Sequence, residues 1–146
     1  TEKGNLMQTI TPYLLYEDVA AALDFLGRAF GFEETLRYSD SEGYINHAEM
    51  RLGPAMINLG DPGPDYRNPR SLGQATVQLH VDVDDVNALF ERAIEAGSEI
   101  VEVPADQEYG QRRCSLLDPE GHMWWFAQQI REVPPEEWGA VTTESA

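Results

Sequence analysis

Histidine and acidic side chains occur in two segments whose composition is typical of strands. His47 and Glu49 are two residues apart, which places them on the same face of one strand, and His80 lies in a later segment. Imidazole and carboxylate groups bind divalent metals and transfer protons. If the two strands converge, these three residues could form a metal site. The alternative is that each is a hydrogen-bonded group on a sheet surface.

The single cysteine, Cys114, follows Arg112 and Arg113. Positive charge beside a thiol favours the thiolate, so Cys114 is a candidate nucleophile. The alternative is a small core residue, which is the more common role of a lone cysteine in a strand. One cysteine excludes an internal disulfide and fits a reducing compartment, so we expect a cytoplasmic protein.

The segment DPEGHMWWFAQ, residues 118–128, predicts a hairpin. Asp-Pro-Glu-Gly has the composition of a tight turn, and an aromatic-rich strand follows it. Trp124 and Trp125 must point to opposite faces of that strand, so both faces are covered. One face can pack on the core, and the other must line a cavity or meet a partner chain.

The register of this hairpin decides which side chains accompany Trp125. Pairing Leu117 with His122 places Cys114 beside Trp125 and Arg112 near it on the same face. A slip of one residue would reverse that list.

The chain predicts the same series of elements twice: a strand, a helix and three strands. Each helix begins after an aspartate, Asp18 or Asp85, and ends at a glycine, Gly31 or Gly97. Internal duplication of this kind is a strong architectural signal. We therefore expect an α+β fold in which two βαβββ modules form a cupped, incompletely closed eight-stranded sheet around a cleft. The predicted segments of the single domain 1–146 are a first module at 9–60, a linker at 61–75, a second module at 76–131 and an acidic tail at 132–146.

Strand alternation indicates which side chains face the cleft. In the segment 76–83, the four valine and leucine residues are expected to pack on a helix, which leaves Gln78, His80 and Asp82 on the other face. If Leu52 pairs with Ala55, then Glu49 lies beside Asn58. The candidate ligand-binding residues are Thr11, Tyr13, Glu49, Asn58, Gln78, His80, Arg112, Cys114 and Trp125. The alternative for Glu49 and its neighbours is a solvated sheet face.

The Asp-Pro-x-Gly-His turn before the last strand and the two Asp-Val helices resemble the vicinal oxygen chelate superfamily. That group includes glyoxalase I, extradiol dioxygenases, fosfomycin-resistance enzymes and bleomycin-binding proteins, and its members usually dimerise. The resemblance covers roughly residues 9–130. Its enzymes hold one divalent metal, and the resemblance places the four ligand positions at Thr11, Asn58, Gln78 and Trp125. Only Gln78 is even a weak metal ligand, and an indole replaces the expected carboxylate.

Ten basic and 26 acidic residues give a net charge of −16. Such a field repels nucleic acid and anionic lipid, so we expect neither as a partner, and no sequence run suggests a membrane span. The predicted function is a metal-free homodimer, without a cofactor, that binds an aromatic or cationic small molecule in the cleft. Trp125 offers a flat apolar surface, and the negative charge suits a cation. The alternatives are a metal-dependent lyase, dioxygenase or thiol transferase with a displaced site, and a structural dimer whose cleft is filled by Trp125.

The composition of the linker at 61–75 predicts a lid, a hinge for exchange between protomers, or a surface loop.

Overall fold

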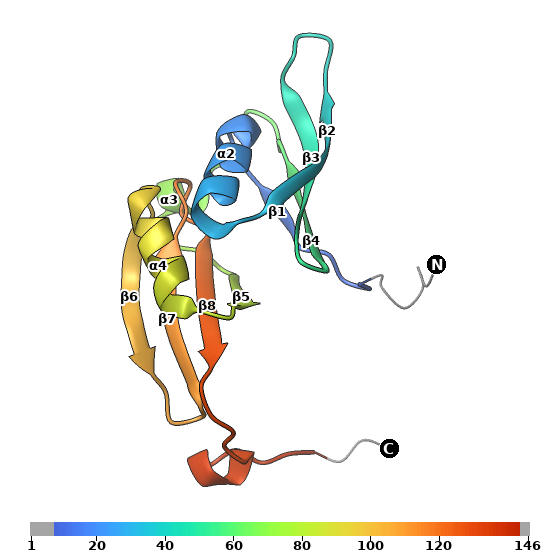
Figure 1. Cartoon of the computed structure of the whole chain (residues 1–146). Helices are drawn as coiled ribbons and strands as arrows, with labels where there is room; N and C mark the ends of the chain where they lie inside the picture. The colour runs from blue at the N-terminus through green and yellow to red at the C-terminus, as the bar shows by residue number, and fades with distance from the viewer. Residues whose placement is uncertain (1–7, 144–146) are drawn as a thin grey trace.

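The computed structural model describes residues 8–143 and contains two modules of identical topology (Figure 1). Each has a four-stranded sheet, with strand orders β1-β4-β3-β2 and β5-β8-β7-β6. This confirms the predicted α+β fold of two βαβββ modules whose sheets do not close. The first module comprises β1 (Tyr13–Leu15), α2 (Val19–Phe30), β2 (Glu33–Ser39), β3 (Ile45–Leu52) and β4 (Ala55–Gly60). The second comprises β5 (Gln78–Asp82), α4 (Val86–Glu95), β6 (Glu99–Asp106), β7 (Gln111–Leu117) and β8 (Met123–Gln129).

The helix boundaries follow from the capping residues that the sequence indicated. Asp18 accepts a hydrogen bond from the Ala21 amide at 3.0 Å, and Asp85 accepts one from Ala88 at 3.0 Å. Gly31 ends α2 with a φ of 84°, a conformation in which a side chain would be strained. Within residues 8–143, no helix is both long and apolar enough to cross a bilayer.

Two short helices lie outside the modules: α3 (Pro69–Leu72) in the linker and the 3-10 helix η1 (Pro135–Trp138) in the tail. The sequence pattern did not predict α3. Arg70 within it donates to the carbonyls of Pro119 at 2.8 Å and Asp118 at 3.3 Å. The linker is therefore held against the turn of the last hairpin. The ends of the predicted domain, residues 1–7 and 144–146, lie outside the described residues.

The strands differ from prediction mainly at their ends. β6 continues through Pro104, where a bend was expected, because β6 is an edge strand and a missing amide there breaks no ladder. Val77 and Ala55 were expected to pack on helices but are exposed, since they lie at or before strand starts. Leu79, Val81, Ile57 and Leu59 do pack on the core as predicted.

The predicted register of the last hairpin is wrong by one residue. Leu117 pairs with Met123, not with His122, and Ser115 therefore lies opposite Trp125. The reason is that Asp118 joins the ladder, donating its amide to the His122 carbonyl at 3.1 Å. The loop then has three residues, and Gly121 supplies the positive φ of 90° that such a loop requires.

The helix-facing sides of both sheets share one core. Phe30 at the end of α2 contacts Phe126 and Trp124 of β8, with ring centroids 4.7 and 5.2 Å apart. Figure 1 shows α2 beside α4, with the two sheets extending in different directions from this centre. The faces not covered by helices, called here the bare faces, therefore do not meet around a common core within the chain.

Asp118 connects the two modules through a buried carboxylate, which is 1% exposed. Its Oδ2 accepts from the Tyr16 hydroxyl at 2.6 Å and from Trp124 Nε1 at 3.1 Å. Its Oδ1 accepts from two amides of its own turn, Glu120 and His122. Burial, reinforced by the Asp118 charge, raises the pKa of Tyr16 well above its ordinary value, so the phenol remains a donor.

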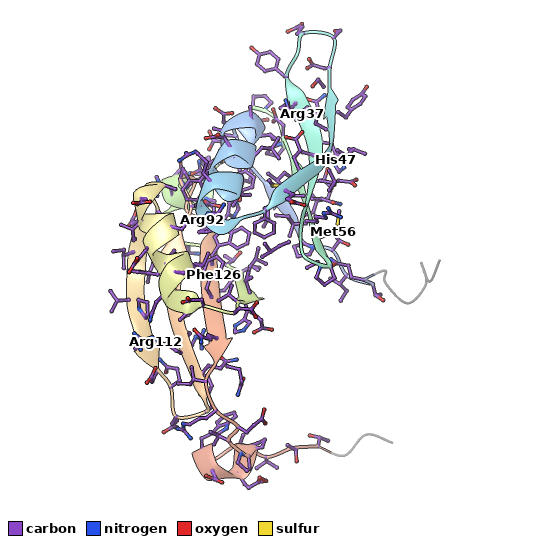
Figure 2. The ribbon with its side chains drawn as sticks, in the orientation of Figure 1. Arg37, His47, Met56, Arg92, Arg112 and Phe126 are labelled. Carbon is purple, nitrogen blue, oxygen red and sulfur yellow. The ribbon has the colours of Figure 1, made fainter. Side chains whose placement is uncertain are left out.

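The second module also holds both ends of α2. The Glu120 carboxylate accepts from the amides of Glu17 at 2.7 Å and Asp18 at 2.9 Å. At the other end, Arg92 of α4 donates to the carbonyls of Arg28 at 2.7 Å and Gly27 at 2.9 Å (Figure 2). An anion at the amino end and a cation at the carboxyl end both complement the helix dipole. The orientation of the modules is thus fixed at three points.

We predict that Asp118→Asn destabilises the fold by about 3 kcal/mol, because an amide NH2 would face two of the four donors. Urea unfolding followed by tryptophan fluorescence measures this. The control is Asp24→Asn, which removes an exposed ion pair with Arg28 and should cost no more than about 0.5 kcal/mol. Equal effects of the two substitutions would contradict the assigned role of Asp118.

Candidate functional site

The bare face of the first sheet carries polar side chains joined by hydrogen bonds. The Tyr13 hydroxyl lies 2.6 Å from His47 Nδ1, and His47 Nε2 lies 3.0 Å from Glu49 Oε2. The predicted pairing across Gly53-Pro54 is confirmed, so Asn58 lies opposite Glu49 and, on its other side, Tyr13. Three of the candidate ligand-binding residues, Tyr13, Glu49 and Asn58, are therefore neighbours. His47, which Figure 2 labels and which was considered only for a metal site, links two of them.

Thr11 precedes β1 and lies near the same edge. Its hydroxyl accepts from Gln8 Nε2 at 3.4 Å, and the same Gln8 side chain bonds both backbone groups of Met56. Thr11 is thus close to this face but is not part of the Tyr13–His47–Glu49 chain.

The bare face of the second sheet carries Gln78 and His80 of β5, beside Met123 and Trp125 of β8. His80 Nε2 lies 3.0 Å from Asp82 Oδ1. His80 and the His47–Glu49 pair belong to different sheets, and the structure does not bring them together. Within residues 8–143, no group of three or more His, Cys, Asp or Glu side chains is placed to hold a metal ion.

Trp125 is covered by a residue that the sequence reasoning did not select. The Arg113 guanidinium carbon lies 3.8 Å from the centroid of the indole ring, which is cation–π contact. Ser115 lies directly opposite Trp125 and is 0% exposed. The correct hairpin register would have identified both residues, because alternation then places Arg113 and Ser115 on the Trp125 face.

Three polar atoms beneath this surface are buried without a hydrogen-bond partner in the described part of the chain: Arg113 Nε, Ser115 Oγ and Trp125 Nε1. Buried donors in native proteins normally have partners, so such a cluster is unusual. An acceptor group would gain hydrogen bonds to these buried atoms once the Arg113 and Trp125 side chains move to admit it.

The acidic tail continues this layer. Arg113 donates to the Tyr109 hydroxyl at 2.5 Å, and the Tyr109 ring lies 5.5 Å from that of Trp138 in η1. Trp138 therefore contacts the second module. Trp138 is thus linked through Tyr109 to Arg113, the residue that covers Trp125.

Arg112 and Cys114 lie on the opposite face from the one predicted. Arg112 donates to Asn87 of α4 at 3.0 Å and pairs with Asp106 at 3.0 Å (Figure 2). Cys114 is 0% exposed in the core, and burial raises the pKa of its thiol to about 11. Both corrections follow from the one-residue slip, and the second argues against a thiolate nucleophile.

The four positions that the resemblance assigned to a metal do not fit one. Thr11, Asn58 and Gln78 offer a hydroxyl and two amides, and Trp125 offers no ligand atom. A divalent ion requires anionic or imidazole donors at converging positions. The chemistry of these positions suits hydrogen bonding and stacking instead.

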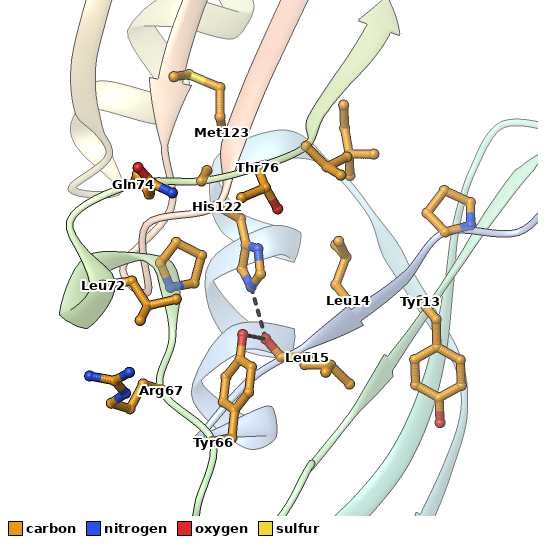
Figure 3. A pocket seen from close by; sticks show the side chains of 15 residues that line it. Tyr13, Leu14, Leu15, Tyr66, Arg67, Leu72, Gln74, Thr76, His122 and Met123 are labelled. Carbon is orange, nitrogen blue, oxygen red and sulfur yellow. Dashed lines mark hydrogen bonds between the residues drawn. The ribbon is translucent and has the colours of Figure 1, made fainter.

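An apolar cavity of about 440 Å³ lies where the modules and the linker meet (Figure 3). Its wall includes Leu14, Tyr66, Leu72 and Met123. His122 and Tyr66 both bond the Leu15 carbonyl there, at 2.8 and 3.2 Å. The sequence could not predict this cavity, because it depends on the folded path of the linker.

The sequence and the fold of this chain are both similar to those of known proteins. Residues 8–126 match the sequence model of the Glyoxalase/Bleomycin resistance protein/Dioxygenase superfamily. An uncharacterised protein of Mycobacterium tuberculosis is 36% identical over 138 residues, covering 91% of this chain and 81% of that protein. The crystal structure of TioX from Micromonospora sp. ML1 has a TM-score of 0.70 and 32% identity, covering 85% of this chain and 100% of that chain. The fosfomycin resistance protein FosX from Listeria monocytogenes has a TM-score of 0.64 at 14% identity, covering 84% and 93%, which is a likeness of fold alone.

We predict that Cys114 is unreactive in the folded protein, because it is buried and protonated at neutral pH. Labelling with a chromogenic disulfide reagent at pH 8 should modify no thiol under native conditions and one thiol per chain in urea. Rapid native labelling would contradict the assigned burial and would restore the nucleophile hypothesis.

Proposed function

Because the chain belongs to the glyoxalase/bleomycin resistance protein/dioxygenase superfamily, we propose that it is a metal-free homodimer that binds a flat aromatic small molecule against the Arg113–Trp125 surface. The observation that carries this proposal is the stacked Arg113–Trp125 pair with three unpartnered polar atoms beneath it. A planar guanidinium offers its outer face to an aromatic ring and its N–H groups to acceptors. The ligand therefore combines an aromatic plane with hydrogen-bond acceptors.

Of the two ligand types that the sequence suggested, the geometry favours the aromatic over the cationic. The Arg113 guanidinium already occupies the position over Trp125 where a cationic guest would bind. A cationic guest would have to displace the Arg113 guanidinium, and the two positive charges would then repel each other. The net charge of −16 attracts cations at long range, but it does not provide a vacant cation site on this ring.

The homodimer is proposed because each bare face is only half of a ligand site. Side chains on the bare face of the first sheet, such as Tyr13 and Tyr38, are 51% and 63% exposed, and Val101 of the second sheet is also exposed. A small-molecule pocket normally encloses most of its ligand. Since the chain directs its two sheets away from one shared core, a second copy must supply the opposing wall. A symmetric pair would then form two equal clefts.

A metal-dependent lyase, dioxygenase or thiol transferase is the alternative. A displaced metal site would need His47, Glu49 and His80 together, but His80 lies on a different sheet from the other two. The enzyme hypothesis therefore has less support than ligand binding at the Arg113–Trp125 surface. Elemental analysis of protein purified without chelators discriminates between the two. Stoichiometric nickel, zinc, manganese or iron would replace the proposal.

We predict that the protein elutes as a dimer, with twice the chain mass of 16.4 kDa by light scattering after size-exclusion chromatography. The physical reason is that dimerisation covers the exposed apolar side chains of both bare faces. A monomer throughout the micromolar range would contradict the shared cleft.

We predict that calorimetric titration ranks three matched probes in the order 2-naphthoate, 2-naphthol and (2-naphthylmethyl)trimethylammonium, from tightest to weakest. Trp125→Leu should weaken the binding of 2-naphthoate at least tenfold, which corresponds to about 1.4 kcal/mol of binding free energy. Tyr44→Leu is the control aromatic substitution, because Tyr44 is 66% exposed and lies in the first module, away from Arg113. Arg113→Met should reverse the order by removing the resident cation.

No binding of any of the three probes would contradict the proposed function. It would favour the structural dimer whose cleft is filled by its own side chains. The cationic probe binding tightest to the unaltered protein would contradict the role of Arg113.

A further inference from the structure

Three side chains on the bare face of the first sheet form a continuous hydrogen-bonded chain. It runs from the Tyr13 hydroxyl to His47 Nδ1 at 2.6 Å, and from His47 Nε2 to Glu49 Oε2 at 3.0 Å. Tyr13 comes from β1 and the other two from β3, and β4 lies between these strands. Two strands that are not adjacent in the sheet are thus linked through one imidazole.

The chemistry of the three groups fixes the direction of these bonds. The Glu49 carboxylate can only accept, so His47 Nε2 carries a proton. In the neutral imidazole Nδ1 is then the acceptor, and the Tyr13 hydroxyl donates to it. This is the order of a nucleophile, a base and an orienting carboxylate, with a phenol as the nucleophile.

The surroundings allow this arrangement. Gly60 lies opposite His47 in the ladder, and a Cβ at Gly60 would come within 2.6 Å of the Tyr13 ring. The glycine therefore provides the space in which the phenol reaches across β4. Tyr13 is 51% exposed in the single chain, so its ring lies open to a small ester on this face.

Asn58 lies opposite Tyr13 in the ladder, two residues before the Gly60 over which the phenol reaches. It pairs with Tyr13 on one side and with Glu49 on the other, and its amide bonds no side chain among the described residues. An amide N–H at this position can donate to an oxygen that gains negative charge near Tyr13.

We propose that Tyr13, His47 and Glu49 form an acyl-transfer site for small activated esters, independent of any metal and distinct from the Arg113–Trp125 surface. The Tyr13 oxygen attacks the ester carbonyl carbon and forms a new C–O bond, while the phenol proton passes to His47 Nδ1. The tetrahedral intermediate collapses, the bond to the leaving alcohol or phenol breaks, and that oxygen leaves with its electron pair and takes up the proton. Water, with His47 again as the base, releases the acid and restores Tyr13.

The test uses p-nitrophenyl acetate and the full chain. We expect a burst of one nitrophenolate per chain, addition of one acetyl group by intact mass, and location of that group on Tyr13 by peptide mapping. Tyr44, which is 66% exposed but has no imidazole partner, is the internal comparison and should react about a hundredfold more slowly.

Substitutions separate the three roles. Tyr13→Phe removes only the hydroxyl and should abolish the burst, whereas Tyr44→Phe should leave it unchanged. His47→Ala should slow acylation about a hundredfold, and added imidazole should restore part of the rate, which a purely structural histidine would not allow. Glu49→Gln should slow it less, because Glu49 acts by positioning His47.

Acetylation at lysines or the amino terminus instead of Tyr13 would overturn the proposal, as would a rate insensitive to His47→Ala. The reaction requires residues of one chain only. A protein that acylates but neither dimerises nor binds naphthalene probes would refute the proposed function alone, and the reverse result would refute this site alone.

Discussion

The buried carboxylate of Asp118 is the constraint on which the arrangement of this molecule depends. Four donors converge on it, one of them the Tyr16 hydroxyl from the other module. An ionised group this deeply buried is tolerated only when its lone pairs are satisfied, so the partners must be in place together. The carboxylate therefore couples formation of the last hairpin turn to docking of the first module.

This coupling explains why the bare faces lie where they do. Asp118 and Glu120 hold the start of α2, and Arg92 holds its end, so the helix cannot rotate on the second sheet. Trp124 then packs against α2, and alternation directs Trp125 to the opposite face. The same interaction that builds the core thus determines which indole is available for a ligand.

The sequence was sufficient wherever a local signal fixed the geometry. Aspartate caps, the glycine after α2 and the two-residue Gly53-Pro54 turn determined the helices and the register of β3 with β4. The last hairpin was misplaced because Asp118 was assigned to a turn, whereas its tertiary bonds to Tyr16 and Trp124 draw it into the ladder. That single slip exchanged Cys114 and Arg112 for Ser115 and Arg113, and so concealed the cation over Trp125. The linker helix depends on contacts with the hairpin turn, which no local pattern encodes.

The two bare faces carry different chemistry, and this difference argues for pairing between copies. The first sheet presents the hydrogen-bonded side chains of Tyr13, His47 and Glu49, and the second presents a stacked cation and aromatic ring. Neither face alone encloses a small molecule, and one chain cannot fold them together without breaking the contacts of Asp118. In a symmetric pair, the Tyr13 face of one copy would oppose the Trp125 face of the other. A ligand held by its aromatic plane on the second sheet would then be enclosed by the polar side chains of the first, as a small-molecule pocket requires.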